Sequence, residues 1–148
     1  MADVPVFKSK WQLQKNETFR IRFNLEEIEN QRVKLSLREK GEGSVEHWVE
    51  FYLWDYNAMI KLRKQATQHH QESNTFYVDA DLFNDLKVRF LLKDWSFGQI
   101  EPQMKLAHLN NALSDESFMM FKSFLPWIAS AIIAKMNEVL EGYEGYED

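Results

Sequence analysis

The chain has 148 residues and a formal net charge of −5, because 23 Asp and Glu outnumber 18 Lys and Arg. This length fits one domain, or two small subdomains that share a core. A composition of 45% hydrophobic residues, with 11 Phe, 5 Trp and 5 Tyr, excludes a disordered or fibrous chain. The absence of cysteine excludes disulfides, thiol nucleophiles and cysteine-based zinc sites, and it fits a reducing compartment.

The sequence has neither the pattern of a membrane span nor that of a secretory signal. Its longest uncharged stretch, residues 123–134, is interrupted by Pro126 and is too short to cross a bilayer. Residues 1–11 lack the apolar segment of a signal peptide. We therefore expect a cytoplasmic protein without membrane association, in the host cytoplasm if a phage encodes it.

The negative charge is concentrated at the C-terminal end. Five acidic residues and no basic ones follow Lys135, and without these five the remaining 18 acidic residues balance the 18 basic ones. Residues 5–40 contain nine basic and five acidic side chains. A basic first segment with an acidic tail indicates a polyanionic partner, although ordinary solubilising charge gives the same pattern. We expect residues 141–148, a Gly-Tyr-Glu repeat, to be disordered and to modulate binding of that partner or recruit others.

Two-residue alternation of apolar and polar side chains predicts β-strands in the first half of the chain. The expected strands cover residues 6–13, 18–25, 32–38 and 45–54. Asp55 is a typical helix N-cap, and the apolar spacing becomes helical over residues 56–67.

The second half is expected to repeat this plan after a polar linker at residues 68–74. Strands are predicted over residues 76–82, 86–92 and 102–109. Ser114 marks the start of a helix, and Pro126 kinks that helix or starts a new one that ends near Gly142. The expected fold is α+β, a single domain over residues 1–140 with its helices on one side. It consists of two similar antiparallel sheet-plus-helix units, about residues 6–67 and 75–140, followed by the flexible acidic tail 141–148.

The predicted strand over residues 45–54 places large aromatic side chains on its outward face. Its odd positions continue the core face, whereas its even positions carry three large rings beside the outward cations of the neighbouring strands. Bases of a single strand stack on such rings while cations hold the phosphates. The second unit repeats the pattern more weakly, with Tyr77, Lys93 and Trp95 also at outward positions. The candidate nucleic-acid-binding residues are Arg20, Arg22, Lys34, Arg38, Trp48, Tyr52, Trp54, Lys87 and Arg89.

A protein interface is the alternative interpretation of this face. Aromatic and Arg side chains are also enriched where proteins associate, so the face also suits a non-enzymatic interaction or assembly module. Glu46 and Glu50 share the strand with the rings, and we expect them to pair with Arg20 or Lys34 across the sheet.

The sequence contains no clear catalytic or metal-binding constellation. His69 and His70 lie in the polar linker without further ligands at metal-binding spacing. Asp79 and Asp81 are not followed by the acidic-x-Lys pair of a nuclease, and the five glycines form no phosphate-binding loop. We therefore expect no enzyme activity, no cofactor and no metal.

Two strand sequences, at residues 19–23 and 33–39, come first, and the second ends in an Arg-Glu pair. A Gly-containing turn, a third strand and a helix follow them. In this order the segment 19–63 resembles the single-stranded-DNA-binding core of the transcriptional coactivator PC4. A duplicated unit in one chain is similar to the Whirly proteins, and the Pur-alpha repeat has a comparable plan. The resemblance implies sequence-tolerant binding of single-stranded DNA, or RNA, across curved antiparallel sheets of a homodimer or higher oligomer.

The acidic tail adds to this resemblance. It is similar to the tails of bacterial and phage single-strand-binding proteins, which recruit replication partners with them. The implied setting is DNA replication, recombination or transcription, with replication or recombination proteins as partners of the tail.

Overall fold

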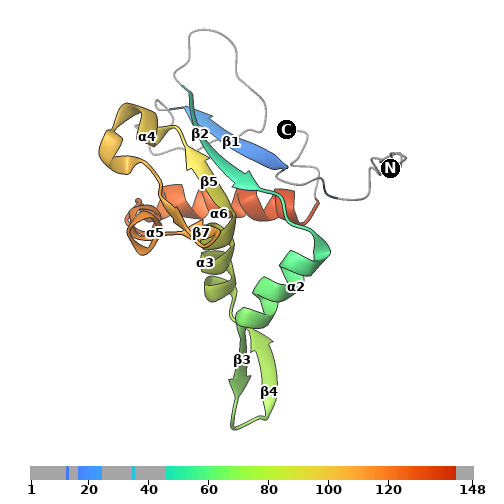
Figure 1. Cartoon of the computed structure of the whole chain (residues 1–148). Helices are drawn as coiled ribbons and strands as arrows, with labels where there is room; N and C mark the ends of the chain where they lie inside the picture. The colour runs from blue at the N-terminus through green and yellow to red at the C-terminus, as the bar shows by residue number, and fades with distance from the viewer. Residues whose placement is uncertain (1–12, 14–16, 25–34, 36–45, 143–148) are drawn as a thin grey trace, which may run out of the picture.

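The computed structural model describes residues 17–24 and 46–142, together with Leu13 and Leu35. The chain is a mixed α+β fold (Figure 1), as the two periodicities in the sequence predict. The described elements are β1 (Thr18–Asn24), β2 (Glu46–Tyr52), α2 (Tyr56–Gln65), β3 (Thr67–His70), β4 (Thr75–Val78), α3 (Ala80–Leu91), β5 (Leu92–Trp95), α4 (Phe97–Ile100), the 3-10 turn η1 (Pro102–Met104), β6 (His108–Leu109), β7 (Ala112–Leu113), α5 (Asp115–Lys122) and α6 (Pro126–Leu140).

Strands β1, β2 and β5 form an antiparallel three-stranded sheet with β2 in the middle. Phe19 lies opposite Phe51 and Ile21 lies opposite Val49, so alternate apolar side chains of both strands point to one face. The strands predicted over residues 18–25 and 45–54 are therefore confirmed, with the predicted faces. The third strand, β5, comes from the second half of the chain.

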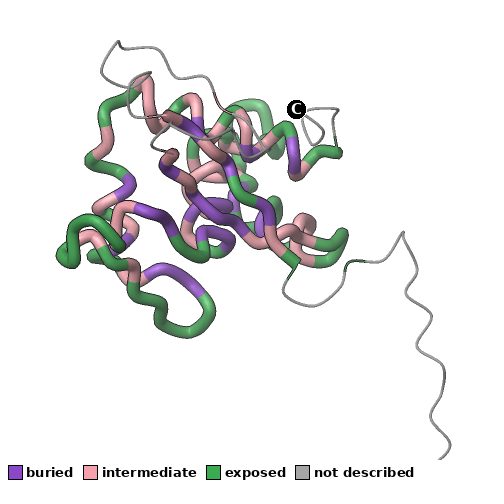
Figure 2. The backbone as a smooth tube through the Cα atoms, turned by 90° about the horizontal axis from the view of Figure 1, so that it is seen from above, coloured by how far each residue is buried: buried purple, intermediate pink, exposed green. Residues whose placement is uncertain are grey.

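Helices α3 and α6 pack against the apolar face of this sheet. Val88 of α3 and Ile132 and Met136 of α6 are buried in one cluster with the apolar side chains of β1 and β2. Burial of each such aliphatic or aromatic side chain stabilises the fold by about 1.5–3 kcal/mol. Buried residues are concentrated in the centre of the molecule (Figure 2), where the sheet meets these helices.

Three helices begin where the sequence predicts. Asp55 caps α2 by accepting a hydrogen bond from the Ala58 N–H, and Ser114 caps α5 by accepting one from the Ser117 N–H. Pro126 starts the separate helix α6, because proline lacks the N–H that a continuous helix needs and is favoured in a first turn.

Two strand predictions for the second half are wrong, and the strand predicted over residues 76–82 is right only as far as Val78, where β4 ends. Residues 86–92 lie almost entirely in α3, whose cap Asp79 accepts a hydrogen bond from the Leu82 N–H. This segment also has apolar residues at helical spacing, since Val88 and the non-alternating Leu91 are three apart and both buried, and the cap at Asp79 starts a helix. Residues 102–109 contain η1 and only the two-residue strand β6, because Pro102 favours a tight turn. The predicted repeat of the first unit in the second half is not confirmed.

The predicted linker at residues 68–74 is instead part of a β-hairpin, β3–β4, that projects from the body of the molecule (Figure 1). All of β4 is exposed, with Phe76 at 73% and Tyr77 at 51%. The two strands are held together by their antiparallel backbone pairing and by a contact between the Phe76 and His69 rings, with 4.8 Å between the ring centroids. No residue of β3 or β4 is buried in the core.

Several predictions fall on residues outside the described part of the chain. These are the strands over residues 6–13 and 32–38, the candidate site residues Lys34 and Arg38, and tail residues 143–148.

Within the described residues, no single helix is long and apolar enough to cross a membrane. Helices α5 and α6 reach the length and hydropathy of a membrane span only when the two are taken together, and the chain bends by 109° between them. Helix α6 buries Ile132, Met136 and Val139 in the protein core.

His47 is a buried polar side chain on the core face of β2. It is 4% exposed, its ring is stacked on Phe97 with 5.2 Å between centroids, and its Nε2 has no hydrogen-bond partner in the described structure. Burial lowers the pKa of His47 below its ordinary value of 6.5. The imidazole is therefore neutral in the folded protein at neutral pH.

Replacing His47 with Phe should remove part of the pH dependence of stability. The unfolded chain protonates His47 near its ordinary pKa of 6.5, whereas the folded chain protonates it only at lower pH. Unfolding therefore takes up a proton, and the free energy of unfolding of the wild type falls as pH drops below 6.5. Urea denaturation across this range should show a flatter profile for His47→Phe. The exposed-site control His69→Phe should keep the wild-type profile, and an unchanged profile in His47→Phe would contradict the assignment.

Candidate functional site

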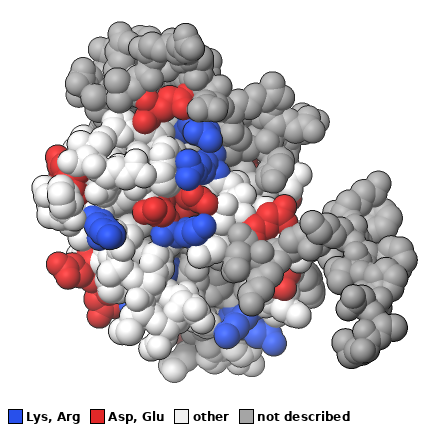
Figure 3. All heavy atoms as spheres, turned by 45° about the horizontal axis from the view of Figure 1, so that its top comes forward, with Lys and Arg blue, Asp and Glu red and all other residues white. Residues whose placement is uncertain are grey.

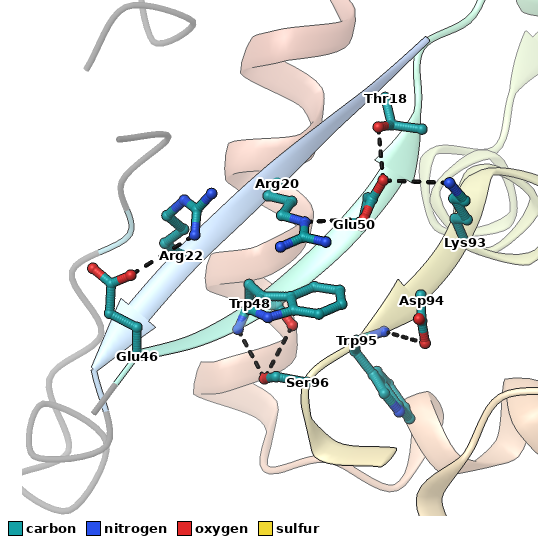
Figure 4. Close-up of polar contacts among 10 residues, drawn as sticks. All are labelled: Thr18, Arg20, Arg22, Glu46, Trp48, Glu50, Lys93, Asp94, Trp95 and Ser96. Carbon is teal, nitrogen blue, oxygen red and sulfur yellow. Dashed lines mark hydrogen bonds and ion pairs between the residues drawn. The ribbon is translucent and has the colours of Figure 1, made fainter. Parts of the chain in front are cut away.

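The outer face of the sheet collects cationic and aromatic side chains from all three strands (Figure 4). Arg20 and Arg22 come from β1, and Trp48 and Tyr52 come from β2, all at positions that alternate with the core residues. We call this surface, completed by Lys93 of β5, the sheet face. Four of the nine candidate residues thus lie on one surface.

A β-bulge brings Lys93 to the sheet face. The pairing of β2 with β5 shifts between Glu50 and Phe51, so Lys93 and Asp94 are both exposed between two buried neighbours. The extra residue reverses the alternation, and Trp95, predicted to point outward, is fully buried. Alternation alone misplaces Trp95 because nothing in the sequence marks the bulge.

Glu50 joins the three strands at the centre of the sheet face. Its Oε2 accepts a hydrogen bond from Thr18 Oγ1 at 2.7 Å, and its Oε1 accepts one from Arg20 Nε at 3.0 Å. Lys93 Nζ lies 3.6 Å from Glu50 Oε2. Burial raises the pKa of Glu50, but the hydrogen bonds and the two cations outweigh it and hold the pKa below its ordinary value of 4.5. The expected pairing of Glu50 with Arg20 is confirmed.

Each of two cations on the sheet face lies over an aromatic ring. Arg20 Cζ is 3.8 Å from the centroid of the Trp48 ring, and Lys93 Nζ is 5.7 Å from that of Tyr52. Ser96 fixes the backbone at Trp48: its Oγ accepts from the Trp48 N–H at 2.9 Å, and its N–H donates to the Trp48 carbonyl at 3.0 Å. Each of these two cation–ring contacts stabilises an exposed site by about 0.5–1 kcal/mol.

Carboxylates balance the positive charge of the sheet face. Arg22 Nη1 lies 3.8 Å from Glu46 Oε2, and Glu50 lies between Arg20 and Lys93. In the space-filling view the basic side chains lie next to acidic ones and do not merge into one positive patch (Figure 3). Asp94, exposed directly opposite Glu50, adds a third carboxylate. Three cations therefore face three carboxylates, and the face carries no excess of positive charge.

Trp54 and Lys87 do not lie on the sheet face. Strand β2 ends before Trp54, and Lys87 lies on helix α3, so neither occupies the outward strand position predicted for it. Trp54 Nε1 donates to the Leu140 carbonyl at 3.2 Å. Lys87 Nζ donates to Asn137 Oδ1 at 2.8 Å and lies 4.0 Å from the centroid of the Phe83 ring. Both side chains line a cavity of about 480 Å³ between the helices.

Lys87 is held inside the protein rather than presented to solvent. It is 5% exposed. Burial lowers the pKa of its amine, and the negative charge of Glu141 partly opposes this effect. An amine that is nearly buried and already hydrogen-bonded to the Asn137 amide is a poor ligand for phosphate, because it would have to give up that bond to bind one.

Arg89 also lies away from the sheet face. On α3 it pairs with Asp115 of α5, and its Cζ lies 5.3 Å from the centroid of the Phe118 ring. Its role in the structure is to join two helices.

No group of three His, Cys, Asp or Glu side chains in the described residues is arranged to hold a metal ion. The histidines of the hairpin instead support its turn. His69 Nε2 lies 3.0 Å from Asn74 Oδ1, and His70 Nδ1 lies 2.8 Å from Ser73 Oγ.

No protein-family model, curated protein or solved structure matches this chain. The resemblance of residues 19–63 to PC4 therefore stays a prediction, and the function is argued from the sheet face itself.

Replacing Glu50 with Gln should lower the free energy of unfolding by about 1–2 kcal/mol at neutral pH. Arg20 and Lys93 lose their shared charged acceptor, but both are well exposed and water compensates part of the loss. Because the folded pKa of Glu50 is lowered, this stabilisation is complete above 4.5 and is lost as pH falls through the folded pKa.

Urea denaturation at several pH values measures the difference. The matched control Glu72→Gln, at an exposed turn residue, should show little change at any pH. A Glu50→Gln variant as stable as the wild type at neutral pH would show that the carboxylate does not join the strands energetically.

Proposed function

We propose that the protein binds single-stranded nucleic acid, DNA in the first place, on the sheet face. The observation that carries this proposal is the Arg20 guanidinium 3.8 Å from the centre of the Trp48 ring on an open antiparallel sheet. Unstacked bases bind to aromatic rings and to guanidinium planes, and duplexes do not expose their base faces. Tyr52 offers a second ring, and Arg22 and Lys93 lie beside the two rings as phosphate partners.

The composition of the sheet face supports sequence-tolerant binding with a modest salt dependence. Stacking contributes about 1–3 kcal/mol per base whatever the base. Three cations limit the slope of log K against log salt to about −2 for a single strand. We propose a role in replication, recombination or transcription, without enzymatic activity, in the cytoplasm.

The proposal includes a fold like that of PC4 and Whirly proteins and an assembly of several chains. Strands β1 and β2 and helix α2 match the first strand, the third strand and the helix of the order expected for the PC4 core, which supports a likeness to PC4 and Whirly proteins. We extend the proposal to a homodimer or higher oligomer in which the sheet faces of several chains bind one strand.

A protein-interaction module is the second candidate, and the pairing of charges favours it. Glu46 and Glu50 neutralise most of the cations on the sheet face, and nearly neutral surfaces with aromatic and Arg side chains are typical of protein interfaces. The same rings would then pack against apolar side chains of another chain.

Trp48→Ala should weaken binding of labelled oligo-dT by about 5- to 150-fold, because one stacked base loses its ring. Fluorescence anisotropy measures the affinity at two salt concentrations, with duplex DNA of the same sequence for comparison. The control Trp54→Phe removes an indole that lies between the helices, and it should leave binding unchanged.

Glu50→Gln separates the two candidate functions in the same assay. Removing a carboxylate from beneath Arg20 and Lys93 raises the positive charge of the sheet face, so oligo-dT binding should tighten by several-fold. The control Glu72→Gln should not. If neither the wild type nor Glu50→Gln binds oligo-dT at low salt, nucleic-acid binding is wrong and the protein-interaction module remains.

Deleting residues 143–148 should tighten oligo-dT binding at low salt. The segment carries Glu144, Glu147 and Asp148, which we propose compete with phosphates for the sheet face or recruit replication and recombination proteins. The gain should disappear at high salt, because the competition is electrostatic. Equal affinity with and without the segment at low salt would show that it does not compete.

A further inference from the structure

A cavity of about 850 Å³ opens at the end of the sheet face. It is lined by Tyr52, Leu53, Phe90, His108, Asn110 and Asn111, and we call it the turn cavity. Its volume lies in the range of ligand pockets, about 300–1,000 Å³. Tyr52 belongs to both surfaces, so the turn cavity adjoins the sheet face.

The hydrogen-bonding groups around the turn cavity include both donors and acceptors. His108 Nε2 lies 2.8 Å from the Leu92 carbonyl, and because a carbonyl only accepts, Nε2 carries the proton. In the tautomer with its only proton on Nε2, Nδ1 is an acceptor. Asn110 and Asn111 each add an amide with donors and an acceptor, and neither amide makes a hydrogen bond within the described residues.

Asn110 and Asn111 are the two central residues of the turn between β6 and β7. Leu109 pairs with Ala112, and both asparagines have positive φ, 54° and 64°. Such a type I′ turn requires residues that tolerate the left-handed region, and glycine does so at no steric cost. The turn alone thus does not require two asparagines.

The turn is held firmly in place. His108 ties β6 to β5 through the Leu92 carbonyl. The Ser114 N–H donates to the Ala107 carbonyl at 2.9 Å, and the Ala107 N–H donates to Ser117 Oγ at 2.8 Å. A hydrogen-bonding edge on a fixed backbone can distinguish between ligands, because a mismatched ligand leaves its polar groups unpaired.

We infer that the turn cavity binds one nucleobase of a strand held on the sheet face, and that Asn110 and Asn111 read its hydrogen-bonding edge. This inference rests on the proposed function. Tyr52 and Phe90 supply apolar walls for a flat ring. Lys93 Nζ, 5.7 Å from the centroid of the Tyr52 ring, is the cation that would pair with the phosphate of that nucleotide. The sheet face then provides sequence-tolerant affinity, and the turn cavity adds a preference at one position.

The double variant Asn110→Gly and Asn111→Gly tests the inference, because it removes both amides and keeps a turn that glycine adopts without strain. Affinities of short homopolymers dT, dC and dA are compared for the wild type and the variant. We expect the wild type to bind one homopolymer more tightly than the others. The variant should lose about fivefold in affinity for that homopolymer for each amide removed, and its affinity for the homopolymer that binds most weakly should not change. The matched control Asn74→Gly makes the same change in the β3–β4 turn, where φ is 51°, and should keep the preference.

The possible outcomes separate this inference from the proposed function. If the wild type binds oligo-dT and the double variant shows the same affinities for all homopolymers, the turn cavity reads no base and the sheet-face proposal stands. If the wild type binds no oligonucleotide, the sheet-face proposal is wrong. In that case NMR titration with nucleoside monophosphates decides: side-chain amide shifts at Asn110 and Asn111 support a base site, and unchanged signals overturn it.

Discussion

The Glu50 carboxylate is the contact on which the sheet and its outer face both depend. It lies on the central strand and accepts from Thr18 and Arg20 on one side, while Lys93 approaches it from the other. One side chain thus links three short strands on the face opposite the helices. Because Glu50 lies directly opposite Arg20, the contact also fixes the register. A slip by one residue would turn this carboxylate into the apolar core, at a cost of several kcal/mol.

The same contact determines what kind of ligand suits the sheet face. Glu50 holds the Arg20 guanidinium over the Trp48 ring and cancels part of its charge. The face therefore combines flat, polarisable surface with a small net charge. A ligand that binds by stacking gains more from such a surface than one that binds by charge alone, and for this reason we propose a single strand rather than a duplex.

The sequence predicts the sheet face better than it predicts the second half of the fold. Strict alternation around Arg20 and Trp48 is unambiguous, because only one assignment of the two strand faces buries all the apolar side chains. Apolar and polar side chains also alternate over residues 86–92, but there the cap at Asp79 and burial against α6 favour a helix. Lys87 and Arg89 therefore lie on α3 and not on the predicted sheet surface. The bulge beside Lys93 depends on the pairing of β5 with β2, which is distant in the sequence, and no local pattern reveals it.

The β3–β4 hairpin has a consequence for how the molecule tolerates change. It joins α2 to α3 but contributes no buried side chain, so the free energy of the core does not depend on the length or composition of its turn. The hairpin can open while the core stays folded, and its backbone amides should exchange with solvent earlier than those of β2. A label or a fused domain inserted between Gln71 and Ser73 would thus be carried at a distance from both the sheet face and the helices.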